Sequence, residues 1–241
     1  KQLLIINILF FLGTQMVGEP AYNYLSLFFF ENAKFQYWQP LTHMFMHGGF
    51  MHIAFNMFAL YSFGSALEHF WGGKKFLFFY ISCGLGAALL HTGVNYFMFH
   101  HGLDALIEVG FNPTEIYALL NDGRMDTTWI DTLGNSGLSN FTGAFASPAV
   151  GASGAIYGLL VAFAFMVPNA ELALMFIPIP IKAKYFVPGL LCIDLFLGLK
   201  GESIFGGASG IAHFAHIGGA LVGFLMMWYW KKNQFGKNRW N

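Results

Sequence analysis

A single serine stands between small residues at the start of a long apolar run. Ser153 lies within the stretch from Gly151 to Gly158 (GASGAIYG), and a hydroxyl in such a place is a candidate nucleophile. Gly154 and Gly158 are four residues apart, which leaves one helix face without side chains, and Tyr157 follows Ser153 by one turn. Taken alone, the stretch is more typical of helix packing than of catalysis, so the other polar residues of the chain decide between the two.

A second polar group lies in an apolar segment near residue 50. His52 and Asn56 are four residues apart, so on a helix they share a face and offer two hydrogen-bond donors side by side. His43 and His47 have the same spacing, which suits a metal ion or, alternatively, hydrogen bonds that tie loops to the helix end. Polar groups are costly in a membrane, so we expect these side chains to face the protein interior.

The last apolar run contains a third polar group. It holds a second GASG sequence with Ser209, followed by His213, His216, Gly219 and Gly223. Ser209 and His216 are separated by about 10 Å of helical rise, which is too far for a hydrogen bond, whereas Ser153 comes from a different segment. Gly219 and Gly223 repeat the spacing of the glycines after Ser153, so the two helices are expected to approach closely.

Together these groups indicate nucleophilic catalysis by a serine. A neutral histidine within about 3 Å takes the proton of the attacking hydroxyl, and His216 can do this for Ser153. The charge that develops on the attacked carbonyl oxygen needs fixed donors, and His52, Asn56 and the Ser153 backbone N–H fit that task. No third acid is evident near the pair, so stacking by Tyr157 is the expected support for the imidazole ring.

The composition is that of a membrane protein. Of 241 residues, 56% are hydrophobic and 10% are charged, the formal net charge is zero and the mean hydropathy is +0.54, whereas soluble domains carry roughly a quarter charged residues. Cys83 and Cys192 lack the spacing of a disulfide framework or a cysteine metal site. No basic patch or nucleotide-binding glycine pattern indicates nucleic acid. The first apolar run lacks a signal-peptide cleavage site and is expected to be a span.

Six apolar segments are each near the roughly 20 residues that a membrane helix needs, although the first is short. They cover residues 3–17, 41–67, 76–99, 148–167, 183–199 and 209–230. If these spans alternate, nine of the twelve basic residues face one side, and Lys34, Arg124 and Lys200 face the other. The positive-inside rule then places both ends of the chain in the cytoplasm. We expect an all-α six-helix membrane bundle, formed by residues 1–241 as a single domain.

Two outer connections have distinct compositions. Residues 18–40 are rich in aromatic side chains, which predicts a loop in the membrane interface or, alternatively, one folded onto the bundle. The outer insertion, about residues 100–147, is acidic and is expected to form an interfacial cap. Within it we predict an amphipathic turn pair at 103–108, a short helix capped at Asn112 and a loop at 134–147.

The fifth span contains a proline and an acid. Pro188 removes a backbone hydrogen bond and weakens the helix locally. Asp194 is interpreted as a helix-to-helix hydrogen bond rather than as a functional group.

The motifs HxxxN, GxSGxxxG and HxxGxxxG, in this order, closely resemble those of the rhomboid intramembrane serine proteases, and the six-span arrangement is similar across nearly the whole chain. The resemblance implies a Ser153–His216 dyad with Tyr157 against His216. It also implies an oxyanion site made by His52, Asn56 and the Ser153 N–H. The supporting glycines that it implies are Gly151, Gly154 and Gly219.

The same resemblance implies the partners and the location. The expected substrates are membrane-spanning proteins, cut near the outer end of a helix, typically after a small residue, and admitted past span five. The expected location is the lipid bilayer of a bacterial inner membrane, with no cofactor, no metal and no nucleic-acid partner. Two features depart from the family pattern: Trp38-Gln39 stands where many members have Trp-Arg, and the outer insertion is unusual.

Three alternatives stay open at this stage. The strongest is a metal-dependent membrane protein that uses His43, His47, His52, His213 and His216. It is disfavoured because HExxH is absent and the acids within spans, Glu68 and Asp194, are expected to lie away from the histidines. The second is a catalytically silent rhomboid-like binding protein, and such proteins commonly lose the serine or the histidine. The third is Ser209 as the nucleophile.

Overall fold

The computed structural model describes residues 1–174, 177–200 and 212–233, most of which are helical. The helices are α1 (Gln2–Val17), α2 (Glu19–Leu25), α3 (Gln39–Thr42), η1 (His43–Phe45), α4 (Phe50–Ala59), η2 (Leu60–Gly64), α5 (Ser65–Trp71), α6 (Gly73–Glu108), α7 (Pro113–Asn121), α8 (Trp129–Ala146), α9 (Ser153–Met166), α10 (Ala183–Lys200) and α11 (Ala212–Asn233). The third alternative nucleophile, Ser209, lies outside the described residues.

A short β-hairpin interrupts the helices. Strands β1 (Glu171–Leu174) and β2 (Ile177–Lys182) pair in antiparallel fashion, with Glu171 opposite Lys182. The prediction of an all-α protein is wrong at this connection. The prolines of β2 are compatible with a strand because proline is tolerated at sheet edges, and a two-stranded sheet consists only of edges.

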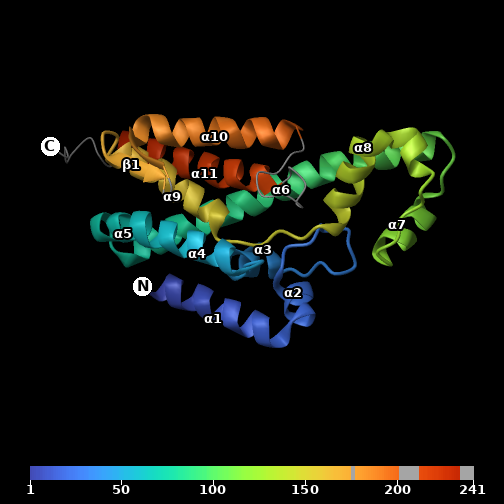
Figure 1. Ribbon diagram of the computed structural model, residues 1–241, viewed down its shortest axis with the longest axis horizontal. Coiled ribbons are helices and arrows are strands. Elements are labelled where there is room, and N and C mark those ends of the chain that lie inside the picture. Colours follow the sequence, from blue (N-terminus) through green and yellow to red (C-terminus); the bar gives the residue numbers. More distant parts are fainter. Residues whose placement is uncertain (175–176, 201–211, 234–241) are drawn as a thin grey trace.

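Three helices form the centre of the molecule. Helix α11 packs against both α6 and α9, and α10 packs on α11. Figure 1 shows α10 on one side of this group, with α4 and then α1 on the other, while α7 and α8 lie toward the far end of the long helix α6. The largest buried cluster includes Phe79 and Tyr80 of α6 and Leu159 of α9.

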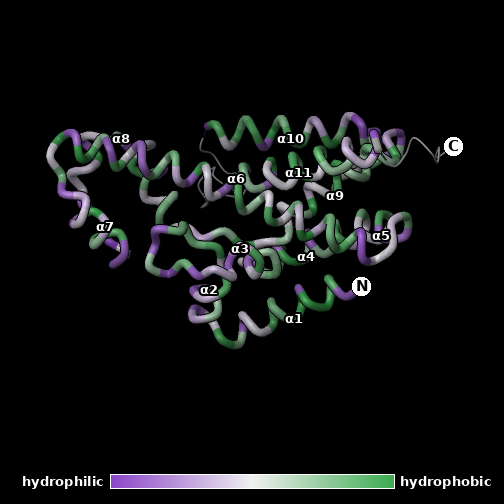
Figure 2. Tube along the Cα trace, turned by 180° about the vertical axis from the view of Figure 1, so that it is seen from behind, coloured by the Kyte–Doolittle hydropathy of each residue, from purple (hydrophilic) through white to green (hydrophobic). Residues whose placement is uncertain are grey.

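The apolar surface of the bundle is extensive. Figure 2 shows hydrophobic residues along much of α1, α6 and α10, and exposed examples include Leu9, Phe97 and Leu199. In the described part of the chain, two helices are long and apolar enough to cross a membrane, Phe50–Trp71 and α6, whereas α1 and α9 are apolar but shorter. This supports a membrane protein, and the count of six spans stays a prediction.

The second predicted span begins later than expected. Instead of one helix from residue 41, the structure has α3, η1 and then α4, which starts at Phe50. Gly48 and Gly49 separate the two parts, because glycine is a poor helix former and Gly49 is fully extended. From Phe50 the helix runs through the π-helical turn η2 to Trp71.

The outer insertion is more helical than predicted. The expected turn pair at 103–108 is the end of α6, which has 36 residues and is about 54 Å long. The expected cap is present, since Asn112 Oδ1 accepts a hydrogen bond from the Thr114 N–H at the start of α7. The prediction of a loop at 134–147 is wrong, because most of this segment belongs to α8.

A buried hydrophobic face explains the helix α8. Its glycines and serines favour a loop by local propensity, but Leu138, Phe141 and Phe145 recur at helical spacing and are buried in one cluster with Phe99 of α6. The rings of Phe99 and Phe141 stack with their centroids 5.0 Å apart. Tertiary packing therefore overrides local composition here, and only Gly134 leaves helical geometry, as a kink.

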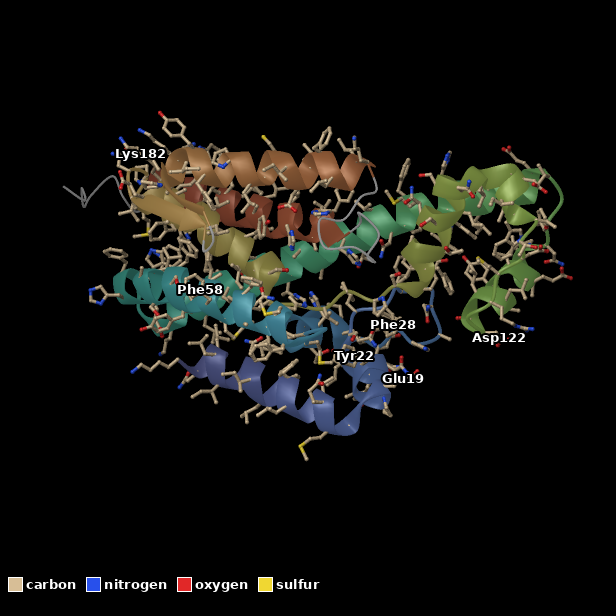
Figure 3. All side chains as sticks on the ribbon, in the orientation of Figure 1. Glu19, Tyr22, Phe28, Phe58, Asp122 and Lys182 are labelled. Atoms are coloured by element: carbon tan, nitrogen blue, oxygen red, sulfur yellow. The ribbon has the colours of Figure 1, made fainter. Side chains whose placement is uncertain are left out.

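The aromatic connection 18–40 folds partly onto the bundle. Phe28 and Phe29 are buried, whereas Tyr37 is exposed. Figure 3 shows Tyr22 and Phe28 in the region of α2 and α3. The Tyr22 hydroxyl donates to the His47 carbonyl oxygen at 2.5 Å. The alternative of a loop folded onto the helices thus describes part of this segment.

Candidate active site

Ser153 is the first residue of α9. The chain enters the helix through Gly151, whose φ of 129° is a backbone conformation that L side chains rarely adopt. The first N–H groups of a helix have no intrahelical acceptor and lie at the positive end of its dipole. The fold therefore presents the Ser153 hydroxyl together with a backbone donor at one place.

His216 of α11 meets Ser153 across a helix interface. Its Nε2 lies 3.0 Å from Ser153 Oγ, which is a hydrogen-bond distance. The ring of Tyr157, one helical turn after Ser153, stacks on the imidazole with centroids 4.2 Å apart and an angle of 7° between the planes. The structure thus brings Ser153, His216 and Tyr157 together, and their catalytic roles stay predictions.

Glycines allow this close approach of α9 and α11. A Cβ atom added to Gly219 would overlap the carbonyl oxygen of Gly154, and one added to Gly223 would lie 2.8 Å from the Cα of Gly158. Glycines at helix contacts let two backbones approach until their backbone atoms touch. The spacing of these four glycines therefore sets the distance between the helices that carry the serine and the histidine.

The structure places His52 and Asn56 differently with respect to the serine. Both lie on α4, and a Cβ built on Gly151 would lie 2.9 Å from His52 Nε2 and 3.5 Å from Ser153 Oγ, so both atoms border the same small space. The Asn56 side chain instead donates to the His52 carbonyl oxygen at 3.1 Å. In the described part of the chain, His52 is one of the residues that line the cavity at Ser153, and Asn56 is not.

An acid that the sequence analysis placed away from the histidines lies beside them. Asp194 of α10 has its Oδ1 atom 3.1 Å from His216 Nδ1 and 2.5 Å from His213 Nδ1. The expectation that no acid is near the pair is therefore wrong. An ionisable residue inside an apolar span is a functional candidate by itself, and that signal was present in the sequence.

The site opens into a cavity of about 430 Å³. Described residues of seven helices (η1, α4, α6, α8, α9, α10 and α11) line it, among them His43, His52, Ser153, Tyr157, Asp194 and His216. Two buried residues of α6, His91 and Asn95, also line it, and their side-chain nitrogens lie 3.2 Å apart. Neither was predicted from the sequence, although polar residues one turn apart in an apolar helix are the pattern that singled out His52 and Asn56.

His43 and His47 do not form a metal pair on one helix. His43 belongs to η1, and its Nδ1 contacts the Gln39 carbonyl oxygen at 3.0 Å. His47 lies in the connection that follows, with its ring 5.1 Å from that of His52. Among the described residues, the group with a geometry able to hold a metal is Asp194, His213 and His216, whose ligand atoms lie within 4.8 Å of one another.

Comparison with known proteins identifies relatives over most of the chain. The Rhomboid domain family matches residues 34–109 and 126–233. The chain is 26% identical over 188 residues to the mitochondrial Rhomboid protein 1 of Saccharomyces cerevisiae, a match that covers 78% of this chain and 40% of the yeast protein. It is 28% identical over 200 residues to Rhomboid protease AarA of Providencia stuartii, which covers 79% of this chain and 54% of that protein.

A shorter segment is similar to a third relative. Over 57 residues the chain is 37% identical to Rhomboid protease GluP of Bacillus subtilis, which covers 24% of this chain and 11% of that protein. The chain spans about half or less of the length of these three relatives. They come from bacteria and from a mitochondrion, so they agree on the family and differ in the compartment.

Proposed function

Because the chain belongs to the rhomboid family of integral membrane proteins, we propose that it is a serine endopeptidase that hydrolyses peptide bonds in or near the transmembrane segments of other membrane proteins. One observation carries this proposal: Ser153 Oγ and His216 Nε2, on two different helices, lie 3.0 Å apart at a cavity. A catalytically silent binding protein has no need of this pair, so its presence favours an active enzyme.

In the proposed reaction His216 acts first as a base and then as an acid. It takes the Ser153 hydroxyl proton as Oγ attacks the carbonyl carbon of the peptide bond. The protonated imidazole then gives this proton to the leaving amine, the peptide C–N bond breaks, and an ester remains on Ser153. His216 next deprotonates a water molecule, which hydrolyses the ester and restores the serine.

The oxyanion formed during each attack needs donors. We assign this task to the Ser153 backbone N–H and to His52, which borders the space at the serine hydroxyl. Asn56 is the third proposed donor, and its amide would have to turn away from the His52 carbonyl oxygen that it contacts. The catalytic water and the substrate carbonyl would meet in the cavity in front of Gly151.

Charge supports an orientation in the membrane. Asp122 of the acidic insertion and Lys182 before α10 lie at opposite ends of the longest axis (Figure 3). With basic residues on the cytoplasmic side, both ends of this sequence would face the cytoplasm and the insertion would face outward. We propose the inner membrane of a bacterium as the location, which fractionation of cells that express the tagged chain would test.

The substrates that we propose are membrane-spanning proteins. They would reach Ser153 past α10, the helix that carries Pro188 in its interior. Residues 1–241 would act as one domain in the bilayer, and no cofactor takes part in the proposed reaction.

Substitution of the serine tests the proposal. We expect Ser153→Ala to abolish cleavage of a reporter transmembrane substrate in proteoliposomes, and Ser209→Ala, the matched change in the second GASG sequence, to leave cleavage in place. A fluorophosphonate probe should label residue 153 in the unchanged protein. The opposite pattern, with Ser209 required and labelled, would overturn the assignment.

A further inference from the structure

Asp194 is an acid buried in an apolar helix. It lies in the middle of α10, and its side chain is 5% exposed. Burying a carboxylate carries a large desolvation cost unless charged or hydrogen-bonding groups compensate it. The partners that Asp194 has in the structure therefore indicate what this position is for.

Two imidazole rings of α11 contact the carboxylate, and Tyr157 of α9 also interacts with it. Asp194 Oδ1 lies 2.5 Å from His213 Nδ1 and 3.1 Å from His216 Nδ1. On the opposite edge of the His216 ring, Nε2 lies 3.0 Å from Ser153 Oγ. The order Asp194, His216, Ser153 thus forms one continuous chain of hydrogen-bond contacts across three helices, α10, α11 and α9.

This order determines which nitrogen of His216 carries the proton. A carboxylate only accepts hydrogen bonds, so a contact with Nδ1 requires a proton on Nδ1. A neutral imidazole with its proton on Nδ1 has a free lone pair on Nε2, which can accept the Ser153 hydroxyl proton. When His216 becomes positively charged during the reaction, the same carboxylate lies beside the new charge.

We propose that Asp194 is a positioning residue that holds the proton of His216 on Nδ1 and stabilises the imidazolium, so that the site works as a Ser153–His216–Asp194 triad. This inference rests on the proposed function of Ser153 and His216. The sequence motifs predict a dyad supported by Tyr157. Tyr157 lies on the face of the imidazole ring, and the geometry adds a carboxylate at its edge.

A purely structural link between α10 and α11 would not need the contact with His216. The 2.5 Å contact with His213 already joins the two helices. They also pack without the acid, since Gly198 of α10 lies so close to Phe214 that an added Cβ would be 3.1 Å from its ring. The contact to His216 is therefore the one that requires a catalytic explanation.

The test compares Asp194→Asn with three further variants in proteoliposomes. Asp194→Glu restores the carboxylate, and His213→Gln removes the other histidine. Glu68→Gln on α5 removes a carboxylate that is not among the described residues lining the cavity. Each variant is measured for kcat and KM on a reporter transmembrane substrate, for the rate of fluorophosphonate labelling at Ser153, and for its Tm.

We expect Asp194→Asn to lower kcat and the labelling rate by about 10²- to 10⁴-fold, as loss of the carboxylate does in other serine proteases. KM and Tm should change little, because the amide keeps the size of the side chain. Asp194→Glu should recover part of the loss. The fold-loss of kcat in His213→Gln should be smaller than that in Asp194→Asn by a factor of about ten or more. Glu68→Gln should behave like the unchanged protein.

Two results would overturn the triad. One is a kcat for Asp194→Asn within about threefold of the unchanged protein. The other is an equal loss of kcat in Asp194→Asn and His213→Gln that accompanies an equal fall in Tm, since that pattern belongs to a structural bridge. If the unchanged protein itself neither cleaves the substrate nor reacts with the probe, the proposed function fails, and the triad fails with it.

Discussion

Tyr157 and His216 lie face to face, with their ring centroids 4.2 Å apart and only 7° between their planes. The stack joins α9 to α11 one turn below the Ser153–His216 contact. It covers a face of the imidazole, while Ser153 and Asp194 contact its two edges. The ring is thus held from three directions by residues of two other helices.

Loss of the aromatic ring at residue 157 should reduce catalysis. A stacked aromatic pair is worth about 0.5–1.5 kcal/mol, so we expect Tyr157→Leu to lower kcat/KM by up to about tenfold. Tyr157→Phe keeps the stack and should retain more activity than Tyr157→Leu. Kinetics on a reporter substrate would check this, and equal losses in the two variants would show that the hydroxyl rather than the stack matters.

Gly219 should not tolerate a side chain. The carbonyl oxygen of Gly154 occupies the place where a Cβ atom of residue 219 would lie. Gly219→Val would therefore push α9 and α11 apart. We expect a loss of stability of about 1–3 kcal/mol from overpacking and a fall in activity of about 10²-fold as Ser153 and His216 separate.

Gly93→Ala on α6 is a control for this variant, because it adds a side chain to a helix glycine that has open space around it. A Cβ at Gly93 meets nothing within 4 Å, so its Tm and activity should equal those of the unchanged protein or slightly exceed them. A Gly219→Val protein with normal activity would contradict the close-packing explanation.

His52 and Asn56 should contribute unequally. His52 borders the space at the serine hydroxyl, whereas the Asn56 amide is bound to the His52 carbonyl oxygen. Removal of one oxyanion donor costs about 10²- to 10³-fold in kcat in other enzymes, and we expect a loss of this size for His52→Ala and a smaller one for Asn56→Ala. An equal loss of kcat with unchanged KM in Asn56→Ala would show that the amide turns into the cavity during the reaction.

Chelation should leave the activity unchanged. The proposed mechanism uses His216 as a base, and no step passes through a metal. Asp194, His213 and His216 nevertheless form a group able to hold an ion, so the measurement discriminates between two chemistries. Cleavage that is lost in excess EDTA and restored by Zn²⁺ would establish a metal-dependent enzyme instead.

The outer insertion should be held in place by Glu31. Its carboxylate accepts a hydrogen bond from the Tyr117 hydroxyl of α7 and lies 2.9 Å from His100 Nε2 of α6. Burial, together with the hydrogen bond and the charge of Glu31, raises the pKa of Tyr117, so this hydroxyl stays protonated at neutral pH and can donate. The contact therefore holds α7 against the connection 18–40.

Removal of that hydroxyl should expose the insertion to proteolysis. A hydrogen bond to a charged group is worth about 1.5–3 kcal/mol, so Tyr117→Phe should speed tryptic cleavage after the exposed Arg124 by about tenfold or more. Glu115→Gln, at an exposed position of the same helix, is the control and should change the rate little. Equal cleavage rates for Tyr117→Phe and the unchanged protein would mean that ring packing alone holds α7.

Local patterns determined much of the fold and of the site. The spacing of Gly154, Gly158, Gly219 and Gly223 predicted a close contact of two helices, and the structure has that contact. The Asn112 cap marked the start of α7 correctly. These features depend on residues within one or two turns of each other, for which sequence spacing translates directly into position on a helix face.

Other features required contacts between distant segments. Gly134 to Ser147 looks like a loop by composition, and it is helical because Phe141 and Phe145 pack against Phe99 of α6. The paired histidines near residue 43 looked like one helix face, but the helix η1 ends at Phe45 and Met46 is extended, so His47 lies outside it. In the first case tertiary packing outweighs the local preference for a loop. In the second case a local break in the helix overrides the spacing of the histidines.

The sequence by itself determined the family and the apolar helices, and it singled out Ser153 and His216 as a pair, because each of these is recorded in residue types at short, fixed spacings. Only the tertiary structure decided that Asp194 of α10 lies at the Nδ1 edge of His216, while the Asn56 amide donates to the His52 carbonyl oxygen. The rotation and crossing of one helix against another depend on how all their side chains interlock, and spacing along a single helix carries no record of that.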